Sequence, residues 1–561
     1  MAHVEAPVRE IEQSPATPVQ DVRALTGGQA LVEMLMRQGV DTLFALPGIQ
    51  LDGFFEALWD ERSSFNVFHT RHEQATAYMA DGYARVSGKE GVCVVVPGPG
   101  LLNTTAALST AYSCNSPVLA VTGQIRTDMI EVGRGLLHEI PNQLQMIRSV
   151  TKHAARAMTP QEIPGLVDEA FRQLRSGRPR PVEIEIPPDT LFAEAEIDLL
   201  APAAERIRPA GDPDLIEQAA KLLGTAHSPI IYAGGGIHRS GASPELLALA
   251  EMLEAPVVVS RNGKGAISDR HYLAHGWIAD RGLFEKADVI LAVGTRFTQD
   301  YDGARMLASG QSLIQLDVDP EEIGRNTEPH VRLVADAKSG LAALVDRVAA
   351  HNRRRASREE ELTALKHSIR ARLDTIEPQA GFTAALRAEI PDDGILVSEM
   401  TQIGYYSSLA YPVYQPNTFL TPGYQGTLGC GFCIGLGAKV GRPDLPVVSI
   451  NGDGGFGFTM NELATMAQHK IGLVTVVFND NAYGNVRRMQ KYDYNDKIIA
   501  SDLQNPDFMK LADAFGVAGR RVHTADELRL ALRESIKADE PVLIEVPVEE
   551  MPNPWKVLGL R

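Results

Sequence analysis

Cysteine and long apolar runs are scarce in this chain of 561 residues. Its four cysteines cannot form the disulfide framework of a secreted protein, so we expect the reducing environment of the cytoplasm. No stretch reaches the roughly 18 uninterrupted apolar residues of a membrane-spanning helix. Runs such as Val92–Val96 have the length of a strand instead. The first residues also lack the basic start and apolar core of a signal peptide. We therefore expect no membrane partner.

Positive charge is in deficit as well. The chain has 54 Lys and Arg residues against 71 Asp and Glu residues, which gives a formal net charge of −17. Such an acidic surface repels phosphate backbones, so nucleic acid is excluded as the expected partner. What the chain does contain is 44% hydrophobic residues, enough for sizeable cores. At roughly 100–200 residues per domain, its length predicts about three domains.

Short β-branched runs alternate with amphipathic stretches of helical length, which predicts an α/β fold with three doubly wound parallel-sheet domains. The expected strands are Thr42–Leu46, Asn66–His69, Val92–Val96, Val118–Thr122, Ile230–Ala233, Val257–Ser260, Val289–Val293, Leu313–Asp317, Ile395–Ser398, Val447–Ile450, Leu473–Phe478 and Val542–Val546. Segments without periodicity separate the domains. The expected units are a flexible tail at 1–24, a domain at 25–190, a linker at 191–212, a domain at 213–350, a connecting helix at 351–375, a domain at 376–548 and a tail at 549–561.

The stretch from Val447 to Gln490 carries the clearest chemistry. A buried strand leads into the turn Gly452-Asp453-Gly454-Gly455, and after a helix a second strand leads into Asn479-Asp480-Asn481. Because strand–helix–strand returns the chain to the same edge of a parallel sheet, Asp453 and Asp480 can face one another. Mg²⁺ prefers carboxylate and phosphate oxygens, and the glycines let backbone N–H groups approach an anion. Either tripeptide alone indicates only a turn, but the two together indicate a metal and diphosphate site.

This stretch resembles the cofactor motif of thiamine diphosphate enzymes, which begins at Gly-Asp-Gly and ends in a paired-Asn turn. The resemblance implies that Asp453, Asp480 and the backbone oxygen of Ala482 hold Mg²⁺. Where the family usually has Asn, this chain has Asp480, which adds negative charge. The other residues of the stretch that the resemblance implies to bind thiamine diphosphate are Gly452, Gly454, Gly455, Tyr483 and Gly484.

The first domain carries a second segment of this kind. Arg71-His72-Glu73, followed by Ala80-Asp81-Gly82-Tyr83, resembles the acetolactate synthase branch of the family. The resemblance implies that Glu73 protonates N1′ of the aminopyrimidine, which favours the imino form that removes the proton from thiazolium C2. Taken alone, a Glu at a helix start is more often a partner for the helix dipole.

Two further segments resemble cofactor contacts. Gly423–Ala438 is similar to the family's segment around the aminopyrimidine. It implies that the Gly426 carbonyl accepts from the 4′-amino group and that Leu428 forces the cofactor into its bent form. Gln402 and Ile403 follow an expected strand at the place where the family has diphosphate contacts.

Two residues are expected on the substrate side of the thiazolium. Gln50 lies in a loop that resembles one pointing at this ring, and Leu137-His138-Glu139 aligns with the Gln-Glu pair of acetolactate synthases. His138 stands in place of that Gln. A neutral imidazole there could hydrogen-bond a substrate oxygen or move a proton, and a structural role is about as plausible from position alone.

The resemblance covers nearly the whole chain after Leu25 and implies a pyrimidine-binding, a middle and a diphosphate-binding domain, in that order. The implied reaction is a thiamine diphosphate- and Mg²⁺-dependent decarboxylation of a small 2-oxo acid, with the resulting enamine joined to an acceptor carbonyl. The family places its cofactor between subunits, which implies a homodimer or homotetramer. Some members hold FAD in the middle domain. Because this chain looks shorter around His275–Lys286, we expect FAD, or another adenine nucleotide, to be absent.

Other functions stay open at this point. A lyase that cleaves or forms 2-hydroxy ketones or 2-hydroxyacyl-CoA shares the early steps of this reaction. The Trp that defines acetolactate synthases is also absent from this chain, and Met489 lies at or near its position. A nucleotide-dependent oxidoreductase is a remote alternative. Gly98-Pro99-Gly100 follows a strand, but the third glycine and the acidic residue that hold a dinucleotide are missing. A scaffolding protein would not need Glu73, Asp453 and Asp480 together.

Overall fold

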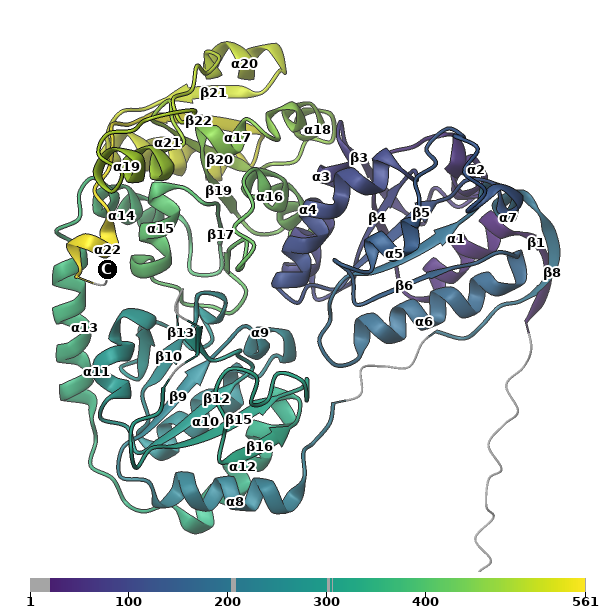
Figure 1. Cartoon of the computed structure of the whole chain (residues 1–561). Coiled ribbons are helices and arrows are strands. Elements are labelled where there is room, and N and C mark those ends of the chain that lie inside the picture. The colour runs from purple at the N-terminus through teal and green to yellow at the C-terminus, as the bar shows by residue number, and fades with distance from the viewer. Residues whose placement is uncertain (1–20, 203–207, 300–302, 305, 560–561) are drawn as a thin grey trace, which may run out of the picture.

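Three parallel sheets of six strands each, flanked by helices, make up three domains in a computed structural model of the chain (Figure 1). The structure describes residues 21–202, 208–299, 303–304 and 306–559. The predicted α/β fold with three doubly wound domains is confirmed. Within those ranges, no helix is long and apolar enough to cross a membrane.

The first domain has the strand order β3-β2-β4-β5-β7-β6, with every neighbouring pair parallel. Its strands are β2 (Thr42–Ala45), β3 (Asn66–His69), β4 (Gly91–Val95), β5 (Val118–Gly123), β6 (His153–Arg156) and β7 (Val182–Ile186). Its helices are α1 (Gly27–Arg37), α2 (Asp52–Asp60), α3 (Glu73–Ser87), α4 (Pro99–Ser113), α5 (Gln143–Ile147), α6 (Ile163–Arg175) and α7 (Pro188–Phe192). The chain changes direction across the sheet between β2 and β4, so the loops after these strands border one crevice.

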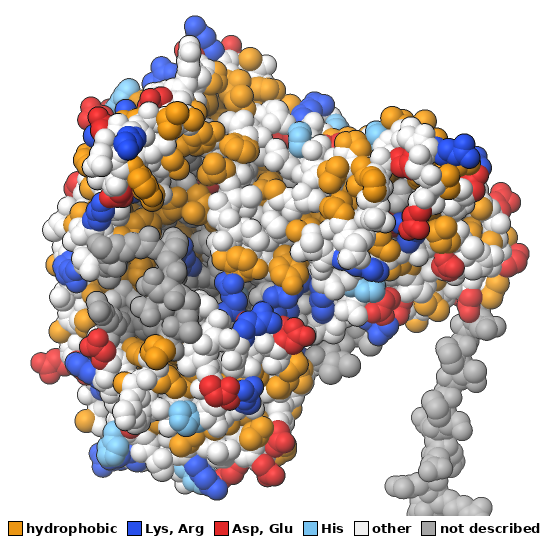
Figure 2. Space-filling model, viewed as in Figure 1, with side chains coloured by type: hydrophobic (Ala, Val, Ile, Leu, Met, Phe, Trp, Pro, Cys, Tyr) orange, Lys and Arg blue, Asp and Glu red, His pale blue; other side chains and the backbone are white. Residues whose placement is uncertain are grey.

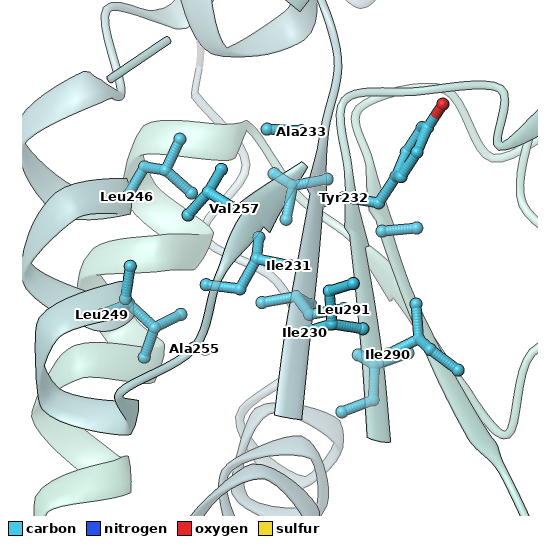
Figure 3. Close-up of a cluster of buried hydrophobic side chains, with 14 of the residues drawn as sticks. Ile230, Ile231, Tyr232, Ala233, Leu246, Leu249, Ala255, Val257, Ile290 and Leu291 are labelled. Carbon is cyan, nitrogen blue, oxygen red and sulfur yellow. The ribbon is translucent and has the colours of Figure 1, made fainter. Parts of the chain in front are cut away.

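The middle domain has the order β11-β10-β9-β12-β15-β16, again all parallel. Its strands are β9 (Pro229–Ala233), β10 (Val257–Val259), β11 (Ala274–Gly276), β12 (Val289–Val293), β15 (Ser312–Asp317) and β16 (Val331–Val334), with a short hairpin of β13 (Thr298–Gln299) and β14 (Gly303–Ala304). Its helices are α8 (Pro213–Thr225), α9 (Gly236–Ser240), α10 (Ser243–Leu253), α11 (Asp280–Phe284) and α12 (Ala337–His351). Figure 3 shows Ile231 of the central strand β9 among buried hydrophobic side chains that include Leu246 of α10 and Leu291 of β12.

The third domain repeats the pattern with the order β18-β17-β19-β20-β22-β21. Its strands are β17 (Ile395–Ser398), β18 (Phe419–Leu420), β19 (Val447–Gly452), β20 (Val474–Asn479), β21 (Ala518–Arg521) and β22 (Val542–Pro547). Its helices are α14 (Gln379–Glu389), α15 (Gln402–Ala410), α16 (Cys430–Gly441), α17 (Asp453–Phe456), α18 (Leu463–Gln468), α19 (Gly484–Tyr492), α20 (Phe508–Ala514), α21 (Ala525–Ala538) and α22 (Pro554–Val557). A separate helix, α13 (Glu359–Leu373), lies in the segment predicted to connect the second and third domains.

Two strands lie where the sequence predicts a tail and a linker. β1 (Val22–Thr26) begins inside the predicted tail, and β8 (Glu194–Asp198) lies inside the predicted linker. They pair with each other in antiparallel register, from Val22 opposite Asp198 to Thr26 opposite Glu194. Neither strand is recognisable alone because each is mostly exposed and carries charged residues. The rest of the predicted tail, residues 1–20, lies outside the described residues.

Helices α3 and α16 join the first and third domains (Figure 1). They approach closely because glycines stand at the crossing. A Cβ atom on Gly437 would overlap the carbonyl oxygen of Met79, and one on Gly82 would overlap that of Ile434. Both glycines are therefore required by backbone contact between the two domains.

Replacing Gly437 by Ala is expected to destabilise the protein by roughly 1–3 kcal/mol, since the two helices must move apart to admit one methyl group. Urea unfolding followed by circular dichroism measures the change. Gly165→Ala is the matched control, because this glycine lies in α6 with open space around it and should gain up to about 1 kcal/mol. Equal urea midpoints for Gly437→Ala and Gly165→Ala would contradict the close contact between α3 and α16.

Candidate active site

Asp453 and Asp480 lie at the ends of two neighbouring parallel strands. Asp453 follows β19 directly and Asp480 follows β20, and Gly452 pairs with Phe478 across these strands. The two carboxyl groups are within hydrogen-bonding reach of each other. Burial and the neighbouring charge of Asp453 raise the pKa of Asp480 to about 7, and burial also raises the pKa of Asp453. Without a cation, the pair holds a proton that an isolated aspartate would lose well below neutral pH.

Asn505 is a residue of this site that the sequence analysis does not identify. Its Nδ2 donates to Asp453 Oδ2 at 2.6 Å and to Asn479 Oδ1 at 3.0 Å, so one amide ties both strand ends together. The adjoining chain closes over the turn, because Tyr483 N donates to the Ser501 carbonyl at 2.8 Å. No motif in the sequence marks Asn505, which is brought here only by the return of the chain before α20.

The glycines of the predicted phosphate turn have two different uses. Cβ atoms on Gly455 and Gly484 would overlap the carboxyl groups of Glu399 and Asp480. A Cβ on Gly454 would lie 2.8 Å from the Tyr483 ring. These three glycines make room for other side chains of the chain. At Gly452 an added Cβ would touch only Thr401, at 3.5 Å, so this position keeps the open backbone expected for a bound anion.

Glu399 is a second buried acid that the sequence analysis does not assign. It lies directly after β17, where its Oε1 accepts a hydrogen bond from Gly429 N. Burial raises the pKa of Glu399 to about 8. The carboxyl group thereby fastens the chain before α16 to the end of β17, close to Gly455.

The segment that holds Gly426 and Leu428 needs glycine for its shape. Gly423, Gly426 and Gly429 have φ values of +64°, +59° and +80°, a region that other residues rarely adopt. Leu428 is half-buried. This conformation explains the glycine spacing of the segment, and the roles of Gly426 and Leu428 toward a cofactor stay predictions.

Gln402 and Ile403 begin helix α15, and their side chains point to different environments. Ile403 is fully buried in the core of the third domain, so its side chain cannot contact a ligand. Gln402 is also buried, but its Oε1 accepts a hydrogen bond at 2.7 Å from Arg488. Arg488 follows Arg487, and from the sequence paired arginines on a helix are expected to form a solvated face or to meet an anion. The structure excludes the solvated face, since Arg488 is 5% exposed.

Glu73 is the first residue of α3 and lies where the first domain meets the third. Its Oε2 accepts from Asn103 Nδ2 at 2.9 Å. The adjacent Gln74 donates to the Phe458 carbonyl at 2.9 Å, in the chain that follows α17. Among the described residues, Glu73 forms no hydrogen bond or ion pair with Asp453 or Asp480. The structure of one chain therefore brings the two aspartates together and leaves Glu73 separate from them.

Gln50 and His138 contact each other. Gln50 Nε2 donates to the Leu137 carbonyl at 3.1 Å, and its Oε1 lies 3.0 Å from His138 Nδ1. A carbonyl only accepts, so the amide orientation is fixed, and the amide oxygen requires a proton on Nδ1. A neutral His138 therefore presents Nε2 as an acceptor. His138 has φ of +68° and its backbone fills the space beside Gly98, which leaves no room there for a dinucleotide phosphate.

A cavity of about 1050 Å³ lies in the middle domain and opens toward the other two domains. Its wall includes the turns after β9 and β12, Asp317 at the end of β15, and Arg178 from the first domain. Arg178 is buried and lies 3.1 Å from Glu322 and 3.7 Å from Asp317. Burial raises the pKa of Asp317 to about 6. Figure 2 shows Lys and Arg side chains gathered on the visible face where the domains meet.

Three domain descriptions match the chain. Residues 25–146 match the thiamine pyrophosphate enzyme N-terminal TPP binding domain, residues 216–344 the central domain, and residues 400–546 the C-terminal TPP binding domain.

Similar proteins cover nearly the full length. A probable acetolactate synthase large subunit of Methanocaldococcus jannaschii is 35% identical, over 94% of this chain and 93% of its own. A probable 2-ketoarginine decarboxylase of Pseudomonas aeruginosa is 35% identical, over 94% and 95%. The acetolactate synthase isozyme 2 large subunit of Escherichia coli is 30% identical, over 95% and 97%.

The coupled aspartates predict a pH effect on the stability of protein freed of divalent cations with EDTA. The folded state keeps a proton on Asp480 up to about pH 7, whereas the unfolded chain releases it near pH 3.8. The free energy of unfolding therefore falls as pH rises between these values, and this loss ends above about pH 7. Asp480→Asn is expected to remove that part of the loss, so its stability relative to the unmodified protein rises with pH.

Urea unfolding at several pH values measures this difference. Asp513→Asn, at an exposed carboxylate on α20, should run parallel to the unmodified protein. If the free energy of unfolding of Asp480→Asn also changed with pH in parallel with that of the unmodified protein, the two acids would not share a proton.

Proposed function

We propose that the chain decarboxylates a small 2-oxo acid and joins the product to an acceptor carbonyl. The reason is that the chain belongs to the thiamine pyrophosphate enzyme family and to its acetolactate synthase branch. The observation that carries the proposal is the buried pair Asp453 and Asp480 at adjacent strand ends, beside the open backbone of Gly452. Two acids that share a proton form a donor set for a hard divalent cation. The residues present therefore fit Mg²⁺ with a diphosphate.

The diphosphate end is built from three segments. Asp453, Asp480 and the Ala482 carbonyl oxygen would hold the cation, and Asn505 keeps Asp453 in place. Gln402 and the first N–H groups of α15 would meet the phosphate oxygens, since a helix start favours an anion. Ile403 contributes through its backbone only, because its side chain is in the core.

Other residues act at the reacting end. When bound, thiamine diphosphate supplies a thiazolium carbon that adds to the 2-oxo group and accepts the electrons released with CO₂. Glu73 would hold the proton exchanged with the aminopyrimidine ring. Gly426 would accept from its amino group, Leu428 would support its bend, and His138 would offer Nε2 to a substrate oxygen.

We propose a homodimer or homotetramer in which Glu73 of one subunit serves the aspartate pair of another. Two observations support this assembly. Glu73 accepts from Asn103 in its own chain, and no hydrogen bond among the described residues joins it to Asp453 or Asp480. In addition, Ile49 and Leu137 are more than 60% exposed beside Gln50 and His138, and Met489 is 41% exposed after the metal turn. Exposed apolar side chains at such places are typical of surfaces that a partner covers.

Three further parts of the assignment remain proposals. The four cysteines are free thiols, which supports a cytoplasmic location. The expected absence of FAD rests on the short segment around His275–Lys286, and the cavity of about 1050 Å³ is large enough for an adenine nucleotide. A lyase acting on 2-hydroxy ketones or 2-hydroxyacyl-CoA is the second candidate, since the replacement at Met489 leaves the acceptor unspecified.

The substrate class is tested by incubating the protein with pyruvate, thiamine diphosphate and Mg²⁺. We expect release of CO₂ and formation of acetolactate, both abolished by EDTA because the two aspartates then have no cation to hold. The same assay with 2-ketoarginine tests the reaction named for the Pseudomonas relative. No CO₂ from any 2-oxo acid, together with cleavage of benzoin or a 2-hydroxyacyl-CoA, would replace this proposal by the lyase.

Glu73→Gln is expected to fold normally and to slow deuterium exchange at C2 of added thiamine diphosphate by about 100-fold or more, because the amide cannot exchange the proton. Proton NMR measures the exchange, and thermal unfolding checks the fold. Glu56→Gln, at an exposed position of α2, is the control and should exchange at the normal rate. Normal exchange in Glu73→Gln would remove Glu73 from its assigned role.

A further inference from the structure

Arg488 is a buried cation whose hydrogen bonds all go to neutral groups. It lies in α19, eight residues after Asp480, and is 5% exposed. Its Nη1 donates to Gln402 Oε1 at 2.7 Å and to the Met551 carbonyl at 3.1 Å, and its Nη2 donates to Asn485 Oδ1 at 2.6 Å. Among the described residues, no carboxylate forms an ion pair with it. An arginine is rarely buried without a counter-charge.

The neighbouring Arg487 shows the ordinary arrangement. It is on the exposed side of the same helix and pairs with Asp502 at 2.6 Å and with Glu550 at 3.7 Å. Glu550 and Asp493, whose charges act on Arg488, form ion pairs with Lys491 and Lys556 instead. The positive charge of Arg488 is therefore left without a partner of its own.

The contact with Gln402 fixes the direction of that amide. A guanidinium only donates, so it must face the amide oxygen, and the amide nitrogen points away from it. Gln402 Nε2 makes no hydrogen bond to a described residue. Gln402 is also the first residue of α15, and Thr401 before it lies against Gly452. Gln402 therefore follows a residue that contacts the turn predicted to hold the diphosphate, and its N–H₂ group remains available to donate.

The negative charge at this end of the site also indicates a role for Arg488. Asp480 stands where the family usually has a neutral Asn. Burial lowers the pKa of Arg488, and the charge of Asp480, together with those of Glu550 and Asp493, opposes this effect. Two aspartates and a diphosphate carry more negative charge than a divalent cation neutralises. A buried guanidinium behind Gln402 reduces that excess without occupying the site.

We propose that Arg488 is a positioning residue for the diphosphate end of thiamine diphosphate. It turns the Gln402 amide nitrogen toward the phosphates, and its charge offsets the extra negative charge of Asp480. The inference rests on the proposed function, since it needs that cofactor at this place.

Titration calorimetry of thiamine diphosphate into cofactor-free protein at constant Mg²⁺ tests the proposal. Arg488→Met removes the charge and the donors but keeps most of the side-chain volume, and it should raise the dissociation constant about tenfold or more, since a charge-assisted contact is lost. Arg487→Met, one residue away and partly exposed, is the matched control and should bind normally. A dissociation constant for Arg488→Met within about twofold of the unmodified protein would overturn the proposal.

A double-mutant cycle separates this role from packing alone. With Asp480→Asn already present, Arg488→Met should cost less binding than it does in the unmodified protein, because the charge to be offset is gone. An equal cost in both backgrounds would overturn the proposal.

If Arg488→Met does not fold, as shown by circular dichroism, Arg488→Lys takes its place. Lys keeps the charge without the planar fork and should retain part of the affinity. Lys binding as tightly as Arg would overturn the positioning role, and no measurable binding would overturn the charge argument. Failure of the unmodified protein to bind thiamine diphosphate is a different result, which removes the proposed function itself.

Discussion

Two buried carboxyl groups at the ends of adjacent parallel strands are the constraint around which the third domain is arranged. Isolated, either acid would be ionised in water at neutral pH, but burial beside each other makes full ionisation unfavourable until a cation arrives. The surrounding residues hold the two carboxyl groups in this arrangement. Asn505 bonds to Asp453, and the glycines at 454, 455 and 484 clear space for neighbouring side chains. The fold thus holds a charge arrangement that is most stable when completed by a ligand.

Local sequence patterns are sufficient to predict the central strands and the approach of Asp453 to Asp480 at two strand ends. The β-branched runs around Val289–Val293 and Ile395–Ser398 are buried on both faces, so their composition alone identifies them. The glycine-rich turns are also visible in the sequence. Before α16 the backbone conformation excludes most other residues, and after β19 the neighbouring side chains leave no room for a Cβ at Gly454 and Gly455.

What the sequence could not predict depends on contacts between distant segments. Asn505 and Arg488 acquire their positions from the return of the chain, and neither has a distinctive neighbourhood in the sequence. Glu399 looks like one more acid near a strand until its burial is known. The strands β1 and β8 were predicted as tail and linker because a two-stranded edge ribbon needs no apolar pattern. The structure of one chain leaves Glu73 apart from the aspartates, and no local pattern in the sequence indicates this separation.

The C-terminal turn touches two separate regions of the molecule. Trp555 packs against Tyr405 of α15, with ring centroids 5.3 Å apart and the ring planes tilted by 59°, and it also borders the middle-domain cavity. The Met551 carbonyl, a few residues earlier, accepts from Arg488. Coupling between two binding sites is reciprocal. A molecule in the cavity that alters this turn would change the affinity of the site beside Arg488 for its ligand, and that ligand would change the affinity of the cavity by the same factor. Residues 551–555 thus form a physical connection between the cavity wall and Arg488.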